Sequence, residues 1–267
     1  MVVEDPSWPR ITDLVYALGF EPEPVGVDER GLVPVALEAA LGRGARAVIA
    51  TPRGQNPTGA TVDADRGHLL RAVLERHPDV LVVEDDYLAA IAGAPYVPLH
   101  GANARWVVIR SLAKVLGPDL RVAPMAGDAL TISRIEGRQL LGPGWVSHLL
   151  QQASAKLWDS AGTRKLLVRA ERTYAQRRSA LVEALGEHGI PASGRSGLGI
   201  WVPVPEEAAT VERLLALGWA VSPGERYRFE APPGVRITTA SLEPAESRDL
   251  AAALAGPLRG TSSTYDG

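Results

Sequence analysis

Four short apolar runs, each followed at once by a polar cluster, are the strongest constraint on the fold of this chain. The runs are Val2-Val3, Ala47 to Ala50, Val80 to Val83 and Trp106 to Ile109. Continuous runs of Val, Ile and Leu are typical of strands buried on both faces, and helical stretches between them imply right-handed crossovers. We therefore expect a mostly parallel sheet, in which the carboxyl ends of all four strands lie on one edge.

Segments with helical periodicity separate these runs and continue beyond them. Helices are expected at 11–18, 33–41, 63–76 and 145–158, and a run at 122–127 is placed to return along the sheet. The pattern predicts a doubly wound α/β fold, in which ligands bind in the crevice along the carboxyl edge of the strands.

The second part of the chain begins with a long amphipathic helix, predicted from Thr163 to His188. Short strands and helices then alternate as in a small α+β layer. They are expected at 199–204 (strand), 208–217 (helix), 219–221 (strand), 235–240 (strand) and 245–254 (helix). We predict a large domain over 1–162, a smaller domain with the linking helix over 163–260, and a frayed tail at 261–267.

Composition excludes several classes of protein. The 267 residues are 46% hydrophobic, enough for a sizeable core, and contain no cysteine for disulfides, a thiolate nucleophile or metal ligation. The formal charge of -3 offers no basic surface for nucleic acid, and the five histidines lack the spacing of metal ligands. Without an apolar stretch of about 20 residues or a secretory signal, we expect a soluble cytoplasmic chain with no membrane partner.

Side chains suited to binding a small polar molecule follow each of the four runs. In chain order they are Trp8, Asn56, Asp85, Tyr87, Ser111, Lys114 and Arg121. These residues are expected to converge, because the carboxyl ends of parallel strands share one edge. Lys114 is the most informative, since an amine just beyond a buried strand is well placed to attack a carbonyl.

A planar pyridinium cofactor, with its aldehyde joined to Lys114 as a Schiff base, would use this set. Asp85 would keep the ring nitrogen protonated, and Asn56 and Tyr87 would donate hydrogen bonds to the ring oxygen. Trp8 would stack on the ring and restrict its tilt.

A phosphate group would complete such a cofactor. Ser111 and Arg121, on either side of Lys114, would supply a hydroxyl and a guanidinium. Two simpler interpretations remain open here: Lys114 could be an ordinary exposed loop lysine, and Arg121 could merely pair with Asp119.

The other motifs also have structural alternatives. Asn56-Pro57-Thr58-Gly59 is a good turn sequence, in which only Asn56 is not required by structure. The acidic residues 84–86 could cap a short helix. Trp8 could fill the core.

Four strings together resemble the class I/II aminotransferases of pyridoxal phosphate fold type I. They are Asn56-Pro57-Thr58-Gly59, Glu84-Asp85-Asp86-Tyr87, Ser111-x-x-Lys114 with Arg121, and Val235-Arg236-Ile237. The second string and Leu116-x-Pro118-x-Leu120-Arg121 are most similar to the aminotransferase-like domain of GntR/MocR-type regulators. The resemblance spans residues 2 to about 255.

The resemblance implies pyridoxal 5'-phosphate as the cofactor, with Lys114 as the Schiff-base lysine and the contacts given above. It also implies that Arg236 clamps a substrate carboxylate bidentately and that Arg10 is a second carboxylate contact. Because the family commonly builds its active site at a homodimer interface, self-association is implied as well.

The sequence departs from the family at its front. The family's glycine-rich turn, which contacts the cofactor phosphate, and its amino-terminal segment, which closes over the substrate, are not found here. Ala113 replaces a hydroxyl residue that commonly precedes the lysine. The chain is therefore expected to be truncated at its amino terminus.

Three functions follow from these patterns. The first is a pyridoxal phosphate-dependent aminotransferase that moves an amino group between an amino acid and a 2-oxo acid. The second is an effector domain that senses the cofactor and an amino compound, from a GntR/MocR-type transcriptional regulator without its winged-helix DNA-binding domain. The third is a truncated product that folds partly and binds nothing.

Overall fold

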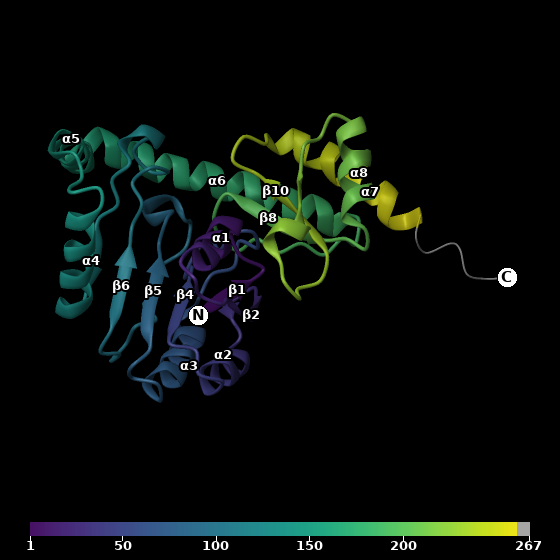
Figure 1. The fold of residues 1–267 in the computed structure, drawn as a ribbon. Coiled ribbons are helices and arrows are strands. Elements are labelled where there is room, and N and C mark those ends of the chain that lie inside the picture. The colour runs from purple at the N-terminus through teal and green to yellow at the C-terminus, as the bar shows by residue number, and fades with distance from the viewer. Residues whose placement is uncertain (261–267) are drawn as a thin grey trace.

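The computed structural model describes residues 1–260, so the predicted tail at 261–267 lies outside the described residues. Two sheets organise the chain (Figure 1). The larger contains β1 (Val2–Asp5), β2 (Glu23–Asp28), β3 (Gly31–Leu32), β4 (Ala47–Ala50), β5 (Leu81–Asp85), β6 (Trp106–Ile109) and β7 (Met125–Gly127). The smaller contains β8 (Gly199–Pro203), β9 (Ser222–Pro223) and β10 (Gly234–Thr238).

The large sheet is mostly parallel, as predicted. Its order is β3-β2-β1-β4-β5-β6-β7, and the edge strands β3 and β7 pair antiparallel with their neighbours. The chain moves outward from β1 to β3 and then crosses to β4 on the other side of β1. The strand order therefore reverses between β1 and β4, which is where doubly wound sheets form a ligand crevice.

Helices connect the strands and cover the sheets. They are α1 (Pro9–Ala17), α2 (Pro34–Gly42), α3 (Ala64–Glu75), α4 (Ala129–Leu141), α5 (His148–Asp159), α6 (Ala161–Glu187), α7 (Glu207–Ala216) and α8 (Pro244–Gly260). Local sequence explains several starts. Asp63 and Asp128 cap α3 and α4 by accepting backbone N–H bonds, and Pro9 and Pro34 begin α1 and α2, where a missing N–H costs no helical bond.

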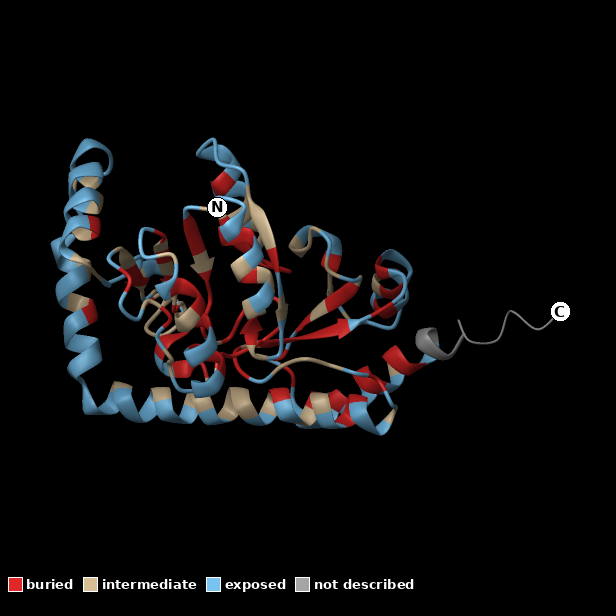
Figure 2. Ribbon diagram, turned by 90° about the horizontal axis from the view of Figure 1, so that it is seen from below, coloured by how far each residue is buried: buried red, intermediate tan, exposed pale blue. Residues whose placement is uncertain are grey.

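We call the seven-stranded sheet with α1 to α5 the large lobe, and the three-stranded sheet with α7 and α8 the small lobe. Helix α6 contacts both, and Figure 2 shows it change from exposed at its start to buried near its end. There Leu181 and Leu185 pack into the small-lobe core with Ile200 and Leu250. The predicted domain boundary after residue 162 falls inside this continuous helix, so that division stays a prediction.

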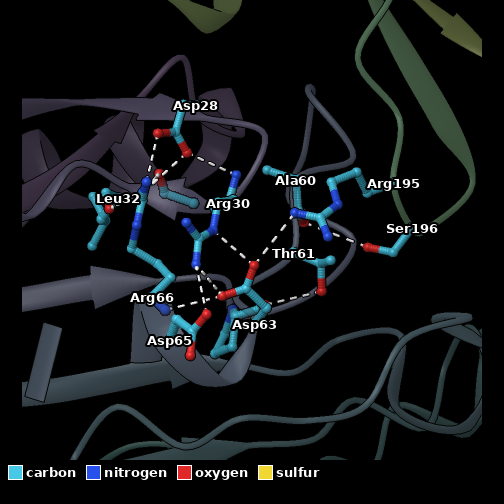
Figure 3. Close-up of polar contacts among 12 residues, drawn as sticks. Asp28, Arg30, Leu32, Ala60, Thr61, Asp63, Asp65, Arg66, Arg195 and Ser196 are labelled. Atoms are coloured by element: carbon cyan, nitrogen blue, oxygen red, sulfur yellow. Dashed lines mark hydrogen bonds and ion pairs between the residues drawn. The ribbon is translucent and has the colours of Figure 1, made fainter. Parts of the chain in front are cut away.

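Buried polar contacts join the two lobes. Ser196, just before β8, is fully buried; its Oγ accepts the N–H of Gly54 at 2.7 Å, and its own N–H donates to the Gly59 carbonyl at 2.9 Å. Nearby, Arg195 lies 3.6 Å from the Asp63 carboxylate (Figure 3). The small lobe thus holds the turn that follows β4.

The ion cluster in Figure 3 also fixes the β2–β3 hairpin on α3. Arg30 binds both carboxylate oxygens of Asp63, at 2.6 and 2.7 Å, and Arg66 binds both of Asp28, at 2.7 and 3.0 Å. Hydrogen bonding from Arg30 is the largest effect on Asp63 and holds its pKa well below the usual range. Bidentate pairs of this kind fix geometry as well as charge.

The structure differs from the sequence prediction where the pattern is weak. The strand predicted at 219–221 is wrong, because pairing with β10 begins only at Ser222. Trp219 and Val221 instead pack beside the small-lobe core. Strands β2 and β3 and helix α4 were not expected from the sequence.

No helix within residues 1–260 is both long enough and apolar enough to cross a membrane.

Candidate functional site

The ends of β1 and β4 meet where the strand order reverses. Trp8 follows β1 as the residue that precedes α1, and Asn56 lies in the turn after β4. Between them, Gln55 donates from Nε2 to the Pro6 carbonyl at 2.7 Å and to the Glu4 carboxylate at 3.2 Å. Two segments predicted to contact a cofactor ring are therefore bonded directly to each other.

The turn that carries Asn56 is tightly bonded. Gln55 Oε1 accepts the N–H and the hydroxyl of Thr58 at 3.0 and 2.6 Å, and the Gly59 N–H donates to the Gln55 carbonyl at 2.6 Å. By contrast, Asn56 Oδ1 is buried without a hydrogen-bond partner among the described residues. Buried polar atoms are nearly always paired, so this unpaired acceptor makes Asn56 a candidate for contact with a ligand.

Trp8 is not a core residue, which rules out that alternative. The residue is 41% exposed, and the Arg10 guanidinium lies 5.9 Å from its ring centroid. The ring is therefore accessible to a planar ligand at the end of β1.

Strand β5 brings Asp85 and Tyr87 to the same edge. Burial, and to a smaller extent the charge of Asp86, raises the pKa of Asp85 to about 6, and no hydrogen bond from residues 1–260 opposes this shift. The Tyr87 hydroxyl donates to the Gly54 carbonyl at 2.7 Å, beside the turn that carries Asn56. Burial also raises the pKa of Tyr87 well above its usual range.

Glu4 is a second buried carboxyl at this edge. It accepts the N–H of Thr51 at 3.0 Å as well as the bond from Gln55. Burial raises its pKa to about 7, and the Asp85 charge acts in the same direction. Neighbouring carboxyls with perturbed pKa values are a common mark of functional sites.

Lys114 lies in the loop between β6 and β7 and is exposed. The Leu112 N–H donates to the Val122 carbonyl at 3.0 Å, and Ser111 Oγ accepts a backbone N–H within the loop at 3.3 Å. Arg121 closes the loop with a φ of 47°, a left-handed conformation that is uncommon for arginine. The loop follows the carboxyl end of β6, as predicted.

Two lysines besides Lys114 occur in the chain, Lys156 and Lys165. Both lie on exposed positions of helices, on α5 and α6, whereas Lys114 lies directly beyond a sheet strand. The predicted role of Lys114 stays a prediction, as do those of Ser111 and Arg121.

Arg236 comes from the small lobe, on β10. Its Nη1 donates to Thr238 Oγ1 at 2.8 Å, and a Cβ at Gly199 would lie only 3.3 Å from its Nη2. Its charge lowers the pKa of Tyr87, against the larger effect of burial, so the guanidinium lies within electrostatic range of the Tyr87 hydroxyl. The predicted role of Arg236 as a carboxylate contact stays a prediction.

The neighbouring acids have structural partners. Asp86 is fully buried and pairs with Arg53 at 2.7 Å and Arg110 at 2.9 Å, whereas Glu84 accepts the Tyr96 hydroxyl at 2.8 Å. The short 3-10 helix that follows, Ala89–Ile91, has no side-chain cap. The capping interpretation of residues 84–86 is therefore wrong.

The described residues contain no ion pair between Arg121 and Asp119, so that alternative is also wrong. They contain no cluster of three potential metal ligands either. A cavity of about 1150 Å³ lies between β6, β7, α4 and α5, and its lining, which includes Trp106, Trp145 and Trp158, contains none of the predicted site residues. The predicted site residues therefore lie outside this cavity.

The sequence model of aminotransferase class I and II matches residues 1–254. The chain belongs to this family. The resemblance seen in the four strings is thus confirmed, and family membership implies pyridoxal phosphate as the cofactor. The desolvated Asp85 carboxyl fits the ring nitrogen of that cofactor.

Curated relatives of this aminotransferase domain include both regulators and enzymes. The vitamin B6 salvage pathway transcriptional repressor PtsJ of Salmonella typhimurium is 39% identical, over 94% of this chain and 59% of the repressor. Aminotransferase tdiD of Emericella nidulans is 26% identical, over 82% of this chain and 56% of the enzyme. The chain thus spans little more than half the length of these relatives.

Among solved structures, the kynurenine aminotransferase of Pyrococcus horikoshii superposes with a TM-score of 0.86 at 23% identity, covering 97% of this chain and 69% of that one. The agreement confirms the predicted pyridoxal phosphate fold type I.

Sequence reasoning missed four residues that hold the site together, namely Glu4, Gln55, Asp5 and Ser196. Glu4 and Asp5 lie in a polar cluster that follows an apolar run, and Gln55 directly precedes Asn56. Their positions in the sequence were therefore enough to identify them as candidate site residues. Ser196 offered no such signal, because its partner is 142 residues away.

Proposed function

We infer that this domain binds pyridoxal phosphate at the carboxyl edge of the large sheet and transfers amino groups between amino acids and 2-oxo acids. The observation that carries the proposal is the reversal of strand order between β1 and β4. It brings an exposed indole ring and the Asn56 side chain, whose Oδ1 is unpaired among the described residues, to one edge, beside the desolvated Asp85 carboxyl at the end of β5. Membership in the aminotransferase class I and II family supports it.

The residues that would hold the cofactor ring come from three strands. Asp85 would pair with the ring nitrogen, and the charge of a pyridinium would lower its pKa again. Asn56 and Tyr87 would donate to the ring oxygen, for which Tyr87 must turn its proton away from the Gly54 carbonyl. Trp8 would cover one face.

The phosphate and the reacting groups would lie on the loop after β6. Ser111 and Arg121 would bind the phosphate. When bound, the cofactor supplies an aldehyde that condenses with amines and a ring that accepts electrons from the substrate. Lys114 Nζ would join that aldehyde at rest and, when free, would take and return the proton of the substrate Cα.

Arg236 would bind the α-carboxylate of the amino acid, with Arg10 as a second contact. Thr238 Oγ1 already accepts a hydrogen bond from Arg236 Nη1 at 2.8 Å, and this bond orients the guanidinium. The planar guanidinium can then offer two parallel N–H donors to a carboxylate.

Regulation is the second candidate function, and one observation favours it. PtsJ, a transcriptional repressor, is 39% identical over 94% of this chain. In this alternative the same residues bind the cofactor and an amino compound, but turnover is not needed. A homodimer and a cytoplasmic location belong to the proposal in either case.

The proposed function is tested by adding pyridoxal phosphate to the purified chain and then supplying amino acids one at a time. An aminotransferase changes the cofactor absorbance and releases the matching 2-oxo acid. A sensor changes the absorbance without releasing a 2-oxo acid. A chain whose absorbance remains that of free cofactor would contradict both functions.

Replacing Arg236 by glutamine is expected to raise the KM for the amino acid about 10- to 100-fold, because charged hydrogen bonds to the carboxylate are lost. Steady-state kinetics measures the change. Arg248, exposed on α8, provides a matched Arg248→Gln control that should keep the original KM. An unchanged KM in Arg236→Gln would remove Arg236 from the substrate site.

A further inference from the structure

Asp5, the last residue of β1, binds the small lobe through its carboxylate. It is buried, with 4% of its surface exposed. Oδ1 accepts the N–H of Phe229, and Oδ2 accepts those of Glu230 and Ala231, all at 2.8 Å. Three successive backbone N–H groups thus converge on one carboxylate, the arrangement of a backbone anion nest.

The bound residues belong to the connection between β9 and β10, residues 224–233. A second bond joins the same connection to the large lobe, because the Ser7 N–H donates to the Tyr227 carbonyl at 2.7 Å. The segment from Asp5 to Ser7 leads directly into Trp8 and α1. The segment that leads into Trp8 and this connection are therefore bonded to each other.

The connection leads into the strand that carries Arg236. Strand β10 is the centre of the small sheet, where Arg236 pairs with Trp201 of β8 and with Ser222 of β9. Gly199 and Thr238 confine its guanidinium. A displacement of residues 229–231 from β1 would therefore shift the strand that carries the guanidinium.

Within the small lobe, Glu207 of α7 holds the same connection from another element. It accepts the N–H of Glu225, the Gly234 N–H at 3.0 Å and the Arg228 Nε at 2.9 Å. Glu207 and Asp5 thus stabilise one segment in different ways. Glu207 ties it to its own lobe, and Asp5 ties it to the lobe that carries the candidate cofactor residues.

We propose that Asp5 is a positioning residue that sets the place of the Arg236 guanidinium relative to Trp8 and the cofactor edge. The proposal rests on the proposed function, because it concerns the carboxylate site of that function. A carboxylate is needed because both of its oxygens accept. An asparagine at this position would keep only one acceptor oxygen, and its NH2 group would face the backbone N–H donors of residues 229–231.

The first test requires no cofactor. In protein labelled with nitrogen-15, the Arg236 Nε–Hε signal is assigned by its loss in Arg236→Lys and then compared in Asp5→Asn and Glu207→Gln. Asp5→Asn should shift this signal and speed hydrogen exchange of the Phe229, Glu230 and Ala231 amides. An Arg236 signal that keeps its position in Asp5→Asn would overturn the proposal, whatever the chain binds.

The second test separates position from stability in the cofactor-loaded protein. Asp5→Asn should raise the KM for the amino acid about tenfold, while the Kd of pyridoxal phosphate and kcat change less than about threefold. In an Arg236→Lys background it should have no further effect on KM. Full additivity, or equal losses of cofactor and amino-acid affinity, would overturn the proposal.

Glu207→Gln is the matched control for a loosened connection. If it raises KM as much as Asp5→Asn at the same loss of Tm, loop stability explains the effect and Asp5 has no positioning role. If the loaded protein shows no amino-acid binding at all, the proposed function fails, and the magnetic resonance result still decides whether Asp5 places Arg236.

Discussion

Replacing Lys114 by alanine is expected to abolish the covalent adduct that sodium borohydride fixes between this domain and pyridoxal phosphate. The reason is positional. Lys114 lies in the loop after β6, at the edge that carries Asp85 and Asn56, whereas Lys156 and Lys165 lie on helices α5 and α6. An amine at the sheet edge can join the cofactor aldehyde while the ring contacts its other partners.

The small number of lysines makes the measurement decisive. After reduction and proteolysis, mass spectrometry should find the cofactor mass on the peptide that contains Lys114 and not on the peptides with the other two lysines. Lys156→Ala and Lys165→Ala are the controls and should retain the full adduct. Equal labelling in Lys114→Ala and the unaltered chain would show that the assignment is wrong.

Replacing Asp85 by asparagine is expected to weaken pyridoxal phosphate binding and yet stabilise the chain without cofactor. Asparagine cannot pair as an anion with the ring nitrogen, so we expect cofactor affinity to fall about 10- to 100-fold. The stabilisation arises because the folded chain desolvates a carboxylate that has no hydrogen-bond donor within residues 1–260.

The sign of the pH dependence follows from the direction of this shift. The pKa of Asp85 is about 6 in the folded chain against 3.8 for an unperturbed aspartate, so the folded state holds the proton more tightly. Its contribution favours folding at low pH, declines as the pH rises from about 4, and is fully lost above pH 6. At pH 8 the asparagine variant should therefore be more stable by about 1 to 3 kcal/mol.

Thermal unfolding of the cofactor-free chain at pH 4 and pH 8 measures this difference. The gain in Tm for Asp85→Asn should be larger at pH 8 than at pH 4. Asp79→Asn, at an exposed position before β5, is the control and should change Tm little at either pH. A loss of Tm at pH 8 would mean that the Asp85 carboxylate is satisfied by contacts other than a bound cofactor.

The buried strands of the large sheet could be predicted from sequence because a strand covered on both faces needs an unbroken apolar run. The runs at 47–50 and 106–109 coincide with β4 and β6. Strand β2 was not predicted, because it contains Pro24 and Gly26 and is only partly buried. Helix α4 was not predicted either, and most of its residues are exposed.

The candidate site could be predicted as far as one sheet edge determines it. Asp85 ends a strand, and Asn56 and the Lys114 loop each follow one, so topology alone brings them together. The contacts across the lobes could not be predicted, because Asp5 and Ala231 are 226 residues apart and carry no shared pattern. Such pairs become visible only when the fold fixes how the lobes meet.

The shared hydrogen bonds at the lobe junction also determine how the chain comes apart. If the small lobe detached, the Asp5 carboxylate would lose three N–H donors, and Ser196 would lose its bond from the Gly54 N–H. Each polar group that loses its hydrogen-bond partner costs about 1 to 3 kcal/mol of stability if it remains buried. Heat should therefore unfold both lobes in a single cooperative transition. For the same reason, we expect neither lobe to fold well when it is expressed as a separate fragment.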